Sequence, residues 1–259
     1  MPFECYGIVT KAEQVRLLLR SRRRMAPSEP DRGALVLANL VVSLFGPPRI
    51  EVDGLAIQVD TRKAIALLAY LAVEGQVQSR ETLAALLWPE SDGLSARSAL
   101  RRTLSTLRTA LGRRWLDVDR QTVRLDPEDL SLDVSRFRDL VDRHRRHSHP
   151  AAEVCPDCTQ ALAEAADLYR GDLLAGFSLR DSPEFDDWQA HEADVFREQL
   201  AVALDGLIAA HAATSRFQEA LTYARRRLSL DLLQESTHQV LMRLHALRGD
   251  RSAALQQYR

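Results

Sequence analysis

Apolar residues recur every three or four positions between residues 95 and 111, which predicts a single α-helix there. At about 3.6 residues per turn, the leucines of this segment fall on one side of the helix. They are Leu100, Leu104, Leu107 and Leu111. The remaining surface carries guanidinium and hydroxyl groups, from Arg97, Ser98, Arg101, Arg102, Ser105, Arg108 and Thr109. The leucine side indicates packing on a core, and the polar side is either an ordinary solvated surface or a surface for phosphates and base edges.

Short β-prone runs stand on both sides of the helical region. Residues 41–45, 49–52 and 55–59 predict a small antiparallel sheet near the start of the chain. Residues 115–118 and 122–125 alternate apolar and polar side chains, which predicts a β-hairpin directly after the basic helix.

Two further helices are expected between the sheet and the basic helix. Thr61 is placed to cap a helix that ends near Glu74. Ser79 is placed to cap a second helix that runs through Leu87, before Pro89 stops it. The order sheet, helix, helix, basic helix and hairpin is that of a winged helix-turn-helix, and the N-terminal sheet indicates its OmpR-like variety.

The last part of the chain repeats with the tetratricopeptide (TPR) period of about 34 residues. The matching residues are Ala220-Leu221 with Ala254-Leu255, and Leu207 and His211 with Leu241 and His245. Such repeats are helix pairs that stack into a solenoid with a concave binding face. Because the pattern stops at Arg259, in a helix whose stacking partner is missing, we expect either a fragment of a longer regulator or an interface at this end.

Charge is distributed unevenly along the chain. Residues 1–36 and 37–127 carry more basic than acidic side chains, whereas residues 128–259 carry an acidic excess that brings the net charge to −1. This arrangement suits a nucleic-acid module joined to a domain that does not bind nucleic acid. We expect residues 1–36 to form a basic, disordered tail; the other interpretation is an arm that follows DNA phosphates.

The 259 residues leave room for two domains of ordinary size. The longest apolar run is far shorter than a bilayer span, and the sequence shows neither a secretory signal nor the cysteine content of a disulfide framework. We therefore expect a cytoplasmic, nucleoid-associated protein that does not contact a membrane.

Catalytic motifs are missing from the sequence, which has no P-loop, no zincin histidine pair and no nucleophile elbow, so we expect no enzyme. Zinc is the one cofactor that the sequence suggests. Cys155 and Cys158 have the C-x-x-C spacing that holds one zinc ion, and His147 and His149 could complete four ligands. The other interpretation is a polar loop that leads into a helix, with the cysteines as small apolar residues.

Separated motifs run in a fixed order along the chain. The first half contains Leu44-Phe45-Gly46, Lys63-Ala64, Leu67-Leu68-Ala69-Tyr70-Leu71-Ala72, Leu86-Leu87-Trp88-Pro89, Ala99-Leu100-Arg101 and Leu107-Arg108. The second half contains Asp133, Phe137, Ala165, the run 168–177, Phe185 and Trp188. Together these motifs resemble the SARP family, the Streptomyces antibiotic regulatory proteins, in which a DNA-binding half precedes a bacterial transcriptional activation domain. The resemblance covers about residues 40–259.

The patterns and the resemblance together predict a mainly α fold with small β-sheets. An OmpR-like winged helix-turn-helix is expected over residues 37–128, followed by an all-α, TPR-like activation domain over residues 129–259. The resemblance also implies that homodimers bind repeated DNA sites and that a loop faces RNA polymerase. The residues of that loop are Glu90, Ser91, Asp92 and Gly93.

We therefore expect a transcriptional activator that binds double-stranded DNA sequence-specifically, with helix 95–111 in the major groove. The candidate contacts are the polar residues of that helix. Arg120 and Arg124 on the predicted wing would reach the minor groove or the backbone, unless the wing packs away from DNA. The alternative is a protein-interaction scaffold, in which the repeat domain is the active part and the winged helix makes protein contacts.

Overall fold

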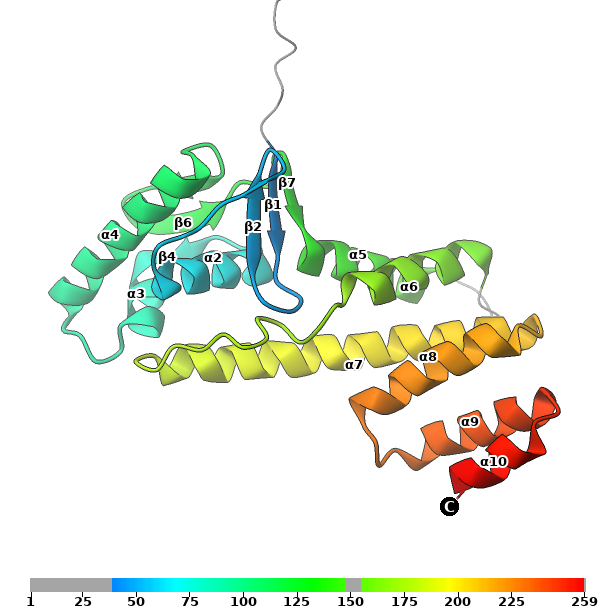
Figure 1. Ribbon diagram of the computed structural model, residues 1–259. Coiled ribbons are helices and arrows are strands. Elements are labelled where there is room, and N and C mark those ends of the chain that lie inside the picture. The colour runs from blue at the N-terminus through cyan, green and yellow to red at the C-terminus, as the bar shows by residue number, and fades with distance from the viewer. Residues whose placement is uncertain (1–38, 148–154, 259) are drawn as a thin grey trace, which may run out of the picture. The chain divides into compact units, whose positions relative to one another are not determined.

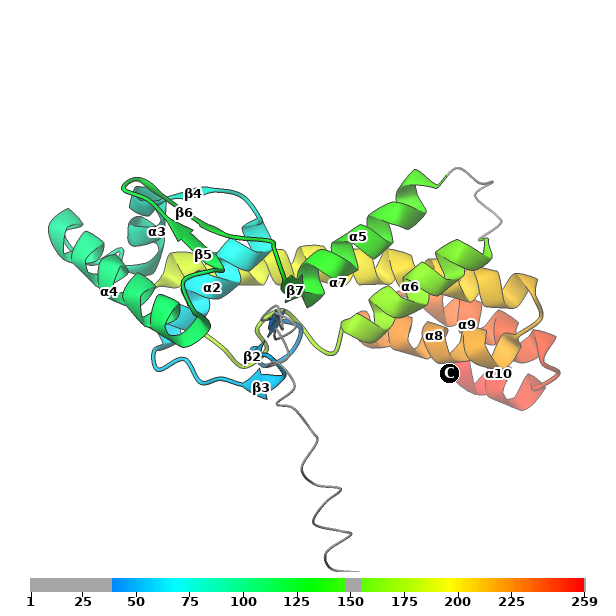
Figure 2. The same cartoon turned by 90° about the horizontal axis from the view of Figure 1, so that it is seen from above.

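The computed structural model describes residues 39–147 and 155–258 (Figures 1 and 2), and the predicted N-terminal tail lies outside them. The first half contains β1 Leu40–Ser43, β2 Arg49–Val52, β3 Leu55–Ala56, α2 Arg62–Glu74, β4 Gln78–Ser79, α3 Arg80–Leu87, α4 Gly93–Leu111, β5 Leu116–Val118, β6 Thr122–Leu125 and β7 Leu130–Leu132. The second half contains α5 Asp133–Arg146, α6 Pro156–Leu168, α7 Pro183–Ala213, α8 Phe217–Leu230, α9 Glu235–Leu247 and α10 Arg251–Tyr258.

The two N-caps predicted for the first helices are confirmed. The hydroxyl of Thr61 accepts the backbone N–H of Ala64 at the start of α2, and the hydroxyl of Ser79 accepts that of Thr82 at the start of α3. Gly75 ends α2 in the left-handed conformation, with a φ of 64°, which a residue without a Cβ adopts at little cost.

The first sheet has the strand order β3-β2-β1-β7. β1 and β2 are antiparallel, as predicted, but β7 pairs parallel to β1, with Leu40 opposite Leu130. The expectation of a purely antiparallel sheet is therefore wrong at this edge, because a three-residue strand far along the chain carries no local signal of its partner. β7 follows residue 128, the predicted end of the winged-helix domain, so residues beyond that point complete its sheet.

The second half is built from packed helices. α5 packs on α6, and α7 extends from α3 at its start to α6 and α8 further along, while α9 packs between α8 and α10 (Figures 1 and 2). Residues that correspond at the 34-residue period of the repeat are buried in both α7 and α9. Leu207 and His211 of α7 and their counterparts Leu241 and His245 of α9 are all buried. The correspondence weakens in α10, where Leu255 is 64% exposed.

The segment Leu44-Phe45-Gly46, which follows β1, is inserted into the second half. Leu44 accepts the N–H of Leu174 at 2.8 Å, and Gly46 donates its N–H to the carbonyl of Asp172 at 3.0 Å. The approach of the two backbones is close, because a Cβ on Gly171 would lie 3.3 Å from the Cα of Gly46. These backbone hydrogen bonds join two of the motifs on which the family resemblance is based.

Phe45 is the centre of an aromatic cluster contributed mainly by the second half. Its ring centroid lies 5.2 Å from that of Phe137, 4.7 Å from that of Tyr169 and 5.1 Å from that of Phe196. All four side chains are buried and belong to one continuous hydrophobic core. The winged helix and the helical half are therefore packed around a shared core.

A buried carboxylate holds the same segment from the other side. Asp133, the first residue of α5, accepts the backbone N–H groups of Leu44, Phe45 and Val134 at 2.9 to 3.0 Å. Burial raises the pKa of Asp133, while the three N–H groups and the guanidinium of Arg170 act in the opposite direction. The carboxylate thus ties the end of β1 to the start of α5.

We predict that Phe45→Ala destabilises both halves together. Removing a fully buried phenylalanine costs about 3–5 kcal/mol in the free energy of unfolding, and the cavity would open at the join. Leu55→Ala is the control, because Leu55 is 72% exposed on β3 and its loss should cost less than about 0.5 kcal/mol. Denaturant unfolding followed by the fluorescence of Trp88 and Trp115 in the first half and Trp188 in the second reports on both halves. A loss equal to that of the control would contradict the shared core.

Candidate nucleic-acid interface

Helix α4 is held in place by its leucines and by a cap at its start. Leu100, Leu104, Leu107 and Leu111 are buried, as predicted. The carboxylate of Asp92 accepts the N–H groups of Leu94 and Ser95. The helix therefore starts at Gly93, two residues earlier than predicted, because Asp92 serves as its N-cap.

Because Asp92 caps α4, the loop expected to face RNA polymerase is shorter than predicted. Glu90, Ser91 and Asp92 lie in the exposed connection between α3 and α4, but Gly93 belongs to the first turn of α4. The loop is exposed throughout, and Leu94, just after it, is 78% exposed.

The polar residues of α4 differ in how far they are presented to solvent. The exposed ones are Arg97, Arg101, Arg102, Ser105 and Thr109, whereas Ser98 and Arg108 are half-buried. Arg102 donates to the hydroxyl of Ser98 at 3.3 Å, and the hydroxyl of Thr109 donates to the carbonyl of Ser105 at 3.0 Å. Arg108 has its Nε buried and without a hydrogen-bond partner among the described residues, so it is the least available of the four arginines.

One side of α4 forms a basic hollow with the hairpin turn and the start of α3. We call it the wing hollow; it has a volume of about 620 Å³ and is lined by Ser79, Arg80, Glu81, Arg97, Arg101, Arg120 and Gln121. The fold thus brings Arg97 and Arg101, predicted on the helix, together with Arg120, predicted on the wing. Arg80 was not predicted as a site residue, because only the β4–β6 pairing brings it to the hairpin turn.

The hairpin turn is held rigidly by hydrogen bonds. The carboxylate of Asp119 accepts the N–H groups of Gln121 and Thr122, both at 2.6 Å, and the hydroxyl of Thr122 at 2.9 Å. Arg80 donates its N–H to the carbonyl of Gln121 at 2.8 Å and its guanidinium to that of Asp119 at 3.0 Å. These bonds place Arg120 at the tip of the turn.

Arg124, the second arginine predicted on the wing, has a different environment. It lies on β6, and its Nε is 3.2 Å from the carboxylate of Asp117 on the neighbouring strand. Both side chains are exposed. Arg124 does not line the wing hollow.

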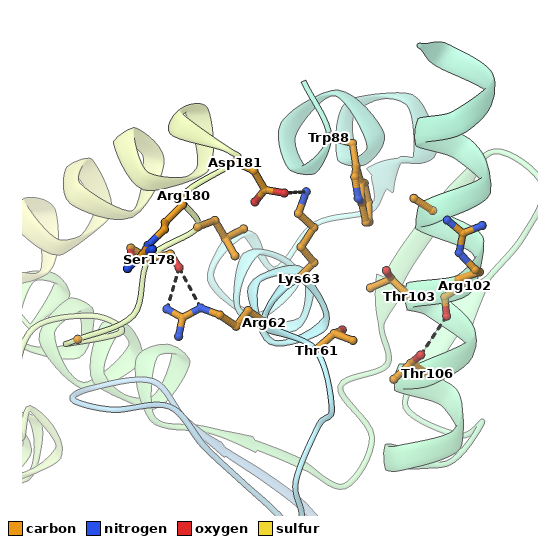
Figure 3. Close-up of a pocket in the computed structure, with 13 residues that line it drawn as sticks. Thr61, Arg62, Lys63, Trp88, Arg102, Thr103, Thr106, Ser178, Arg180 and Asp181 are labelled. Atoms are coloured by element: carbon orange, nitrogen blue, oxygen red, sulfur yellow. Dashed lines mark hydrogen bonds and ion pairs between the residues drawn. The ribbon is translucent and has the colours of Figure 1, made fainter. Parts of the chain in front are cut away.

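The opposite side of α4 faces a second basic cleft (Figure 3). This junction cleft has a volume of about 940 Å³ and is lined by Thr61, Arg62, Lys63, Trp88, Ala99, Arg102, Thr103, Thr106 and, from the segment before α7, Gly176, Ser178, Leu179, Arg180 and Asp181. Arg62 donates to the carbonyl of Ser178, and Lys63 pairs with Asp181 at 2.8 Å. Those two cations hold the helical half against α2, while Arg102 and Arg180 are exposed.

The fold also brings together most of the residues predicted to bind zinc. His147 is the C-cap of α5, Cys155 is the N-cap of α6, and Cys158 lies in the first turn of α6. Burial, together with the neighbouring Cys155, raises the pKa of the Cys158 thiol to about 11. His149 lies outside the described residues.

The described residues thus define an OmpR-like winged-helix protein whose basic helix is mounted on a TPR-like helical domain. Residues 132–259 match the family model of the bacterial transcriptional activator domain. This segment belongs to that family, which agrees with the resemblance to the SARP family that the sequence motifs show.

A solved structure has a similar fold. Mycobacterium tuberculosis EmbR in complex with a low-affinity phosphopeptide matches with a TM-score of 0.61 and 19% sequence identity. The match covers 85% of this chain and 58% of the EmbR chain, so it leaves a large part of EmbR without a counterpart here. A comparison with curated proteins gives no match.

Among the described residues, no helix is both long and apolar enough to cross a membrane. Transcriptional regulation is the role of the matched family, and the expectation that this chain is no enzyme agrees with that role.

We predict that the hairpin turn stays intact as the pH falls to the ordinary pKa of an aspartate. The N–H groups of Thr122 and Gln121 hold the pKa of Asp119 below its ordinary value. A carboxylate whose pKa is lower in the folded chain than in the unfolded chain stabilises the folded state at pH values above the unfolded pKa. This contribution is lost as the pH falls through the lowered, folded-state pKa. The amide NMR shifts of Gln121 and Thr122 should therefore stay constant down to about pH 4, near the ordinary pKa of the residue.

The matched variant for this titration is Asp119→Ala, which removes the acceptor. Its Gln121 and Thr122 amides should exchange with solvent faster than those of the wild-type chain at neutral pH. Wild-type amide shifts with an ordinary aspartate midpoint would contradict the prediction.

Proposed function

We propose that this chain binds double-stranded DNA sequence-specifically through α4, and activates transcription from that position. The observation that carries the proposal is the convergence of Arg80, Arg97, Arg101 and Arg120 on the wing hollow. α3, α4 and the hairpin turn contribute these side chains, and among the described residues Glu81 is the single acidic residue that lines the hollow. A concentration of guanidinium groups beside a solvent-facing helix is suited to phosphates and guanine edges.

The position of α4 fits entry into the major groove. Its leucines are buried on one side, so the arginines of the other side are presented on a fixed support. A major groove about 12 Å wide admits one α-helix. We assign Arg97 and Arg101 to base edges or to the phosphates that border the groove, and Arg120 to the adjacent backbone or minor groove.

The remaining polar residues would contact the DNA backbone. Arg102 faces the junction cleft with Arg180, and Ser105 and Thr109 lie further along the exposed side of α4. Phosphate contacts of this kind position a protein on the duplex without reading sequence. Arg180, from the helical half, would then also contribute to the non-specific affinity of the chain for DNA.

RNA polymerase and a second copy of the chain are the proposed partners on DNA. The exposed connection with Glu90, Ser91 and Asp92 is separate from the wing hollow, so a polymerase could contact it while α4 is bound. The resemblance to SARP regulators supports both this contact and dimers on repeated sites.

The principal test replaces Arg97 and Arg101 by alanine in one variant. Loss of two groove arginines should weaken binding to a selected operator about 30-fold or more, because each good contact contributes about 1–3 kcal/mol and tenfold is about 1.4 kcal/mol. Each lost phosphate contact should also lower the salt slope of binding by about one. Selection from a random duplex library supplies the operator, and fluorescence anisotropy at several salt concentrations measures both quantities.

The matched control carries Arg225→Ala and Arg243→Ala, which remove the same charge from exposed positions on α8 and α9. Its operator affinity should equal that of the wild-type chain. Wild-type affinity and salt slope in the Arg97/Arg101 variant would refute the assignment of α4. A protein-interaction scaffold would give another result, since the wild-type chain would then not be retained on duplex DNA even at low salt.

A second prediction separates activation from DNA binding. Glu90→Lys reverses a charge in the exposed loop without touching the wing hollow, so operator affinity should be kept while activated transcription falls. Glu128→Lys is the control, because Glu128 is also exposed and lies after the hairpin. Transcription reconstituted with purified RNA polymerase measures the effect; full activation by the Glu90→Lys variant would contradict the polymerase contact.

A further inference from the structure

The ends of α5 and α6 bring one imidazole and two thiols to a single point. The Nδ1 atom of His147 lies 3.1 Å from the Sγ of Cys158 and 3.3 Å from the Sγ of Cys155. The donor atoms of the three residues all lie within 4.8 Å of one another. They come from opposite sides of the connection between the two helices, so the fold, and not only the C-x-x-C spacing, assembles them.

We propose that His147, Cys155 and Cys158 form a zinc site that clamps the end of α5 to the start of α6. This site is independent of the proposed DNA binding. It lies in the helical half, and none of its three residues lines the wing hollow or the junction cleft.

The distances suit a tetrahedral ion. Zinc–sulfur bonds of about 2.3 Å and zinc–nitrogen bonds of about 2.0 Å place neighbouring sulfur and nitrogen ligands about 3.5 Å apart. The two Sγ–Nδ1 distances are within a few tenths of an ångström of this value, so small side-chain rotations complete the geometry. Cys155 already accepts the backbone N–H of Cys158 through its sulfur at 3.4 Å, which holds the first turn of α6 around the site.

The chemistry of the donor set selects the metal. Two thiolates with one imidazole favour zinc over magnesium or calcium, which bind oxygen ligands. Cys155 and Cys158 are the N-cap and a first-turn residue of α6, so their sulfur atoms face the end of α5 where His147 lies. A ligand outside these three residues would fill the fourth position.

The expected consequence is structural. α5 and α6 form a helix pair whose inner side chains, including Phe137 and Leu162, belong to the shared core. Zinc would join the C-terminal end of α5 to the N-terminal end of α6, and because it would bind the folded chain more tightly than the unfolded one, it would add to stability. The DNA-binding surface would be affected indirectly or not at all.

Metal content of the purified full chain is the first test. We expect about one zinc per chain, the stoichiometry of a single site, and loss of that zinc in the Cys155→Ser, Cys158→Ser double variant. Cys5→Ser is the matched control, because it removes the remaining cysteine and should leave the zinc content unchanged. Zinc well below one per chain in zinc-supplemented protein, or equal content in the double variant, would overturn the proposal.

Two measurements on the wild-type chain avoid any dependence on the folding of a variant. Chelator-treated protein that is reloaded with cobalt(II) should show a thiolate-to-cobalt charge-transfer band. Cys155, which is half-buried, should be alkylated slowly before chelation and faster afterwards. A missing charge-transfer band, or alkylation unchanged by chelation because the thiols have formed a disulfide, would also overturn the proposal.

Discussion

The insertion of Leu44-Phe45-Gly46 into the helical half is the interaction on which the rest of the structure depends. Three contributions meet there: backbone bonds to Asp172 and Leu174, the N–H groups bound by Asp133, and the aromatic cluster around Phe45. Each involves residues on both sides of the predicted domain boundary. The winged helix is therefore not joined by a free linker, because its sheet is completed by β7 and its core continues into α5 and α7.

Rigid attachment has a consequence for how the two halves can act. A winged helix on a free linker would let its activation domain take many positions relative to DNA. Here the ion pair of Lys63 with Asp181, and the hydrogen bonds of Arg62 to Ser178, add further contacts beside α4. The position of α4 on a duplex would then also set the position of the helical half, whose acidic excess suits a surface turned away from phosphates.

Local sequence signals predicted the elements well, but not their assembly. The caps at Thr61 and Ser79 and the leucines of α4 act within a few residues, so the pattern alone revealed them. The parallel strand β7 and the place of Arg80 beside the hairpin turn depend on partners far away in the chain. The proposed zinc ligands were partly predictable, because C-x-x-C spacing is local, whereas the approach of His147 depends on how α5 packs on α6.

The structure most directly implies that α4 and the hairpin turn form the DNA-binding surface while α8, α9 and α10 stay clear of the duplex. Hydrogen–deuterium exchange of the full chain, with and without a bound operator duplex, tests it most directly. The account predicts slower exchange in peptides from α3, α4 and the β5–β6 hairpin, and unchanged exchange in α8, α9 and α10. Protection confined to α8–α10, with α4 and the hairpin unchanged, would contradict it.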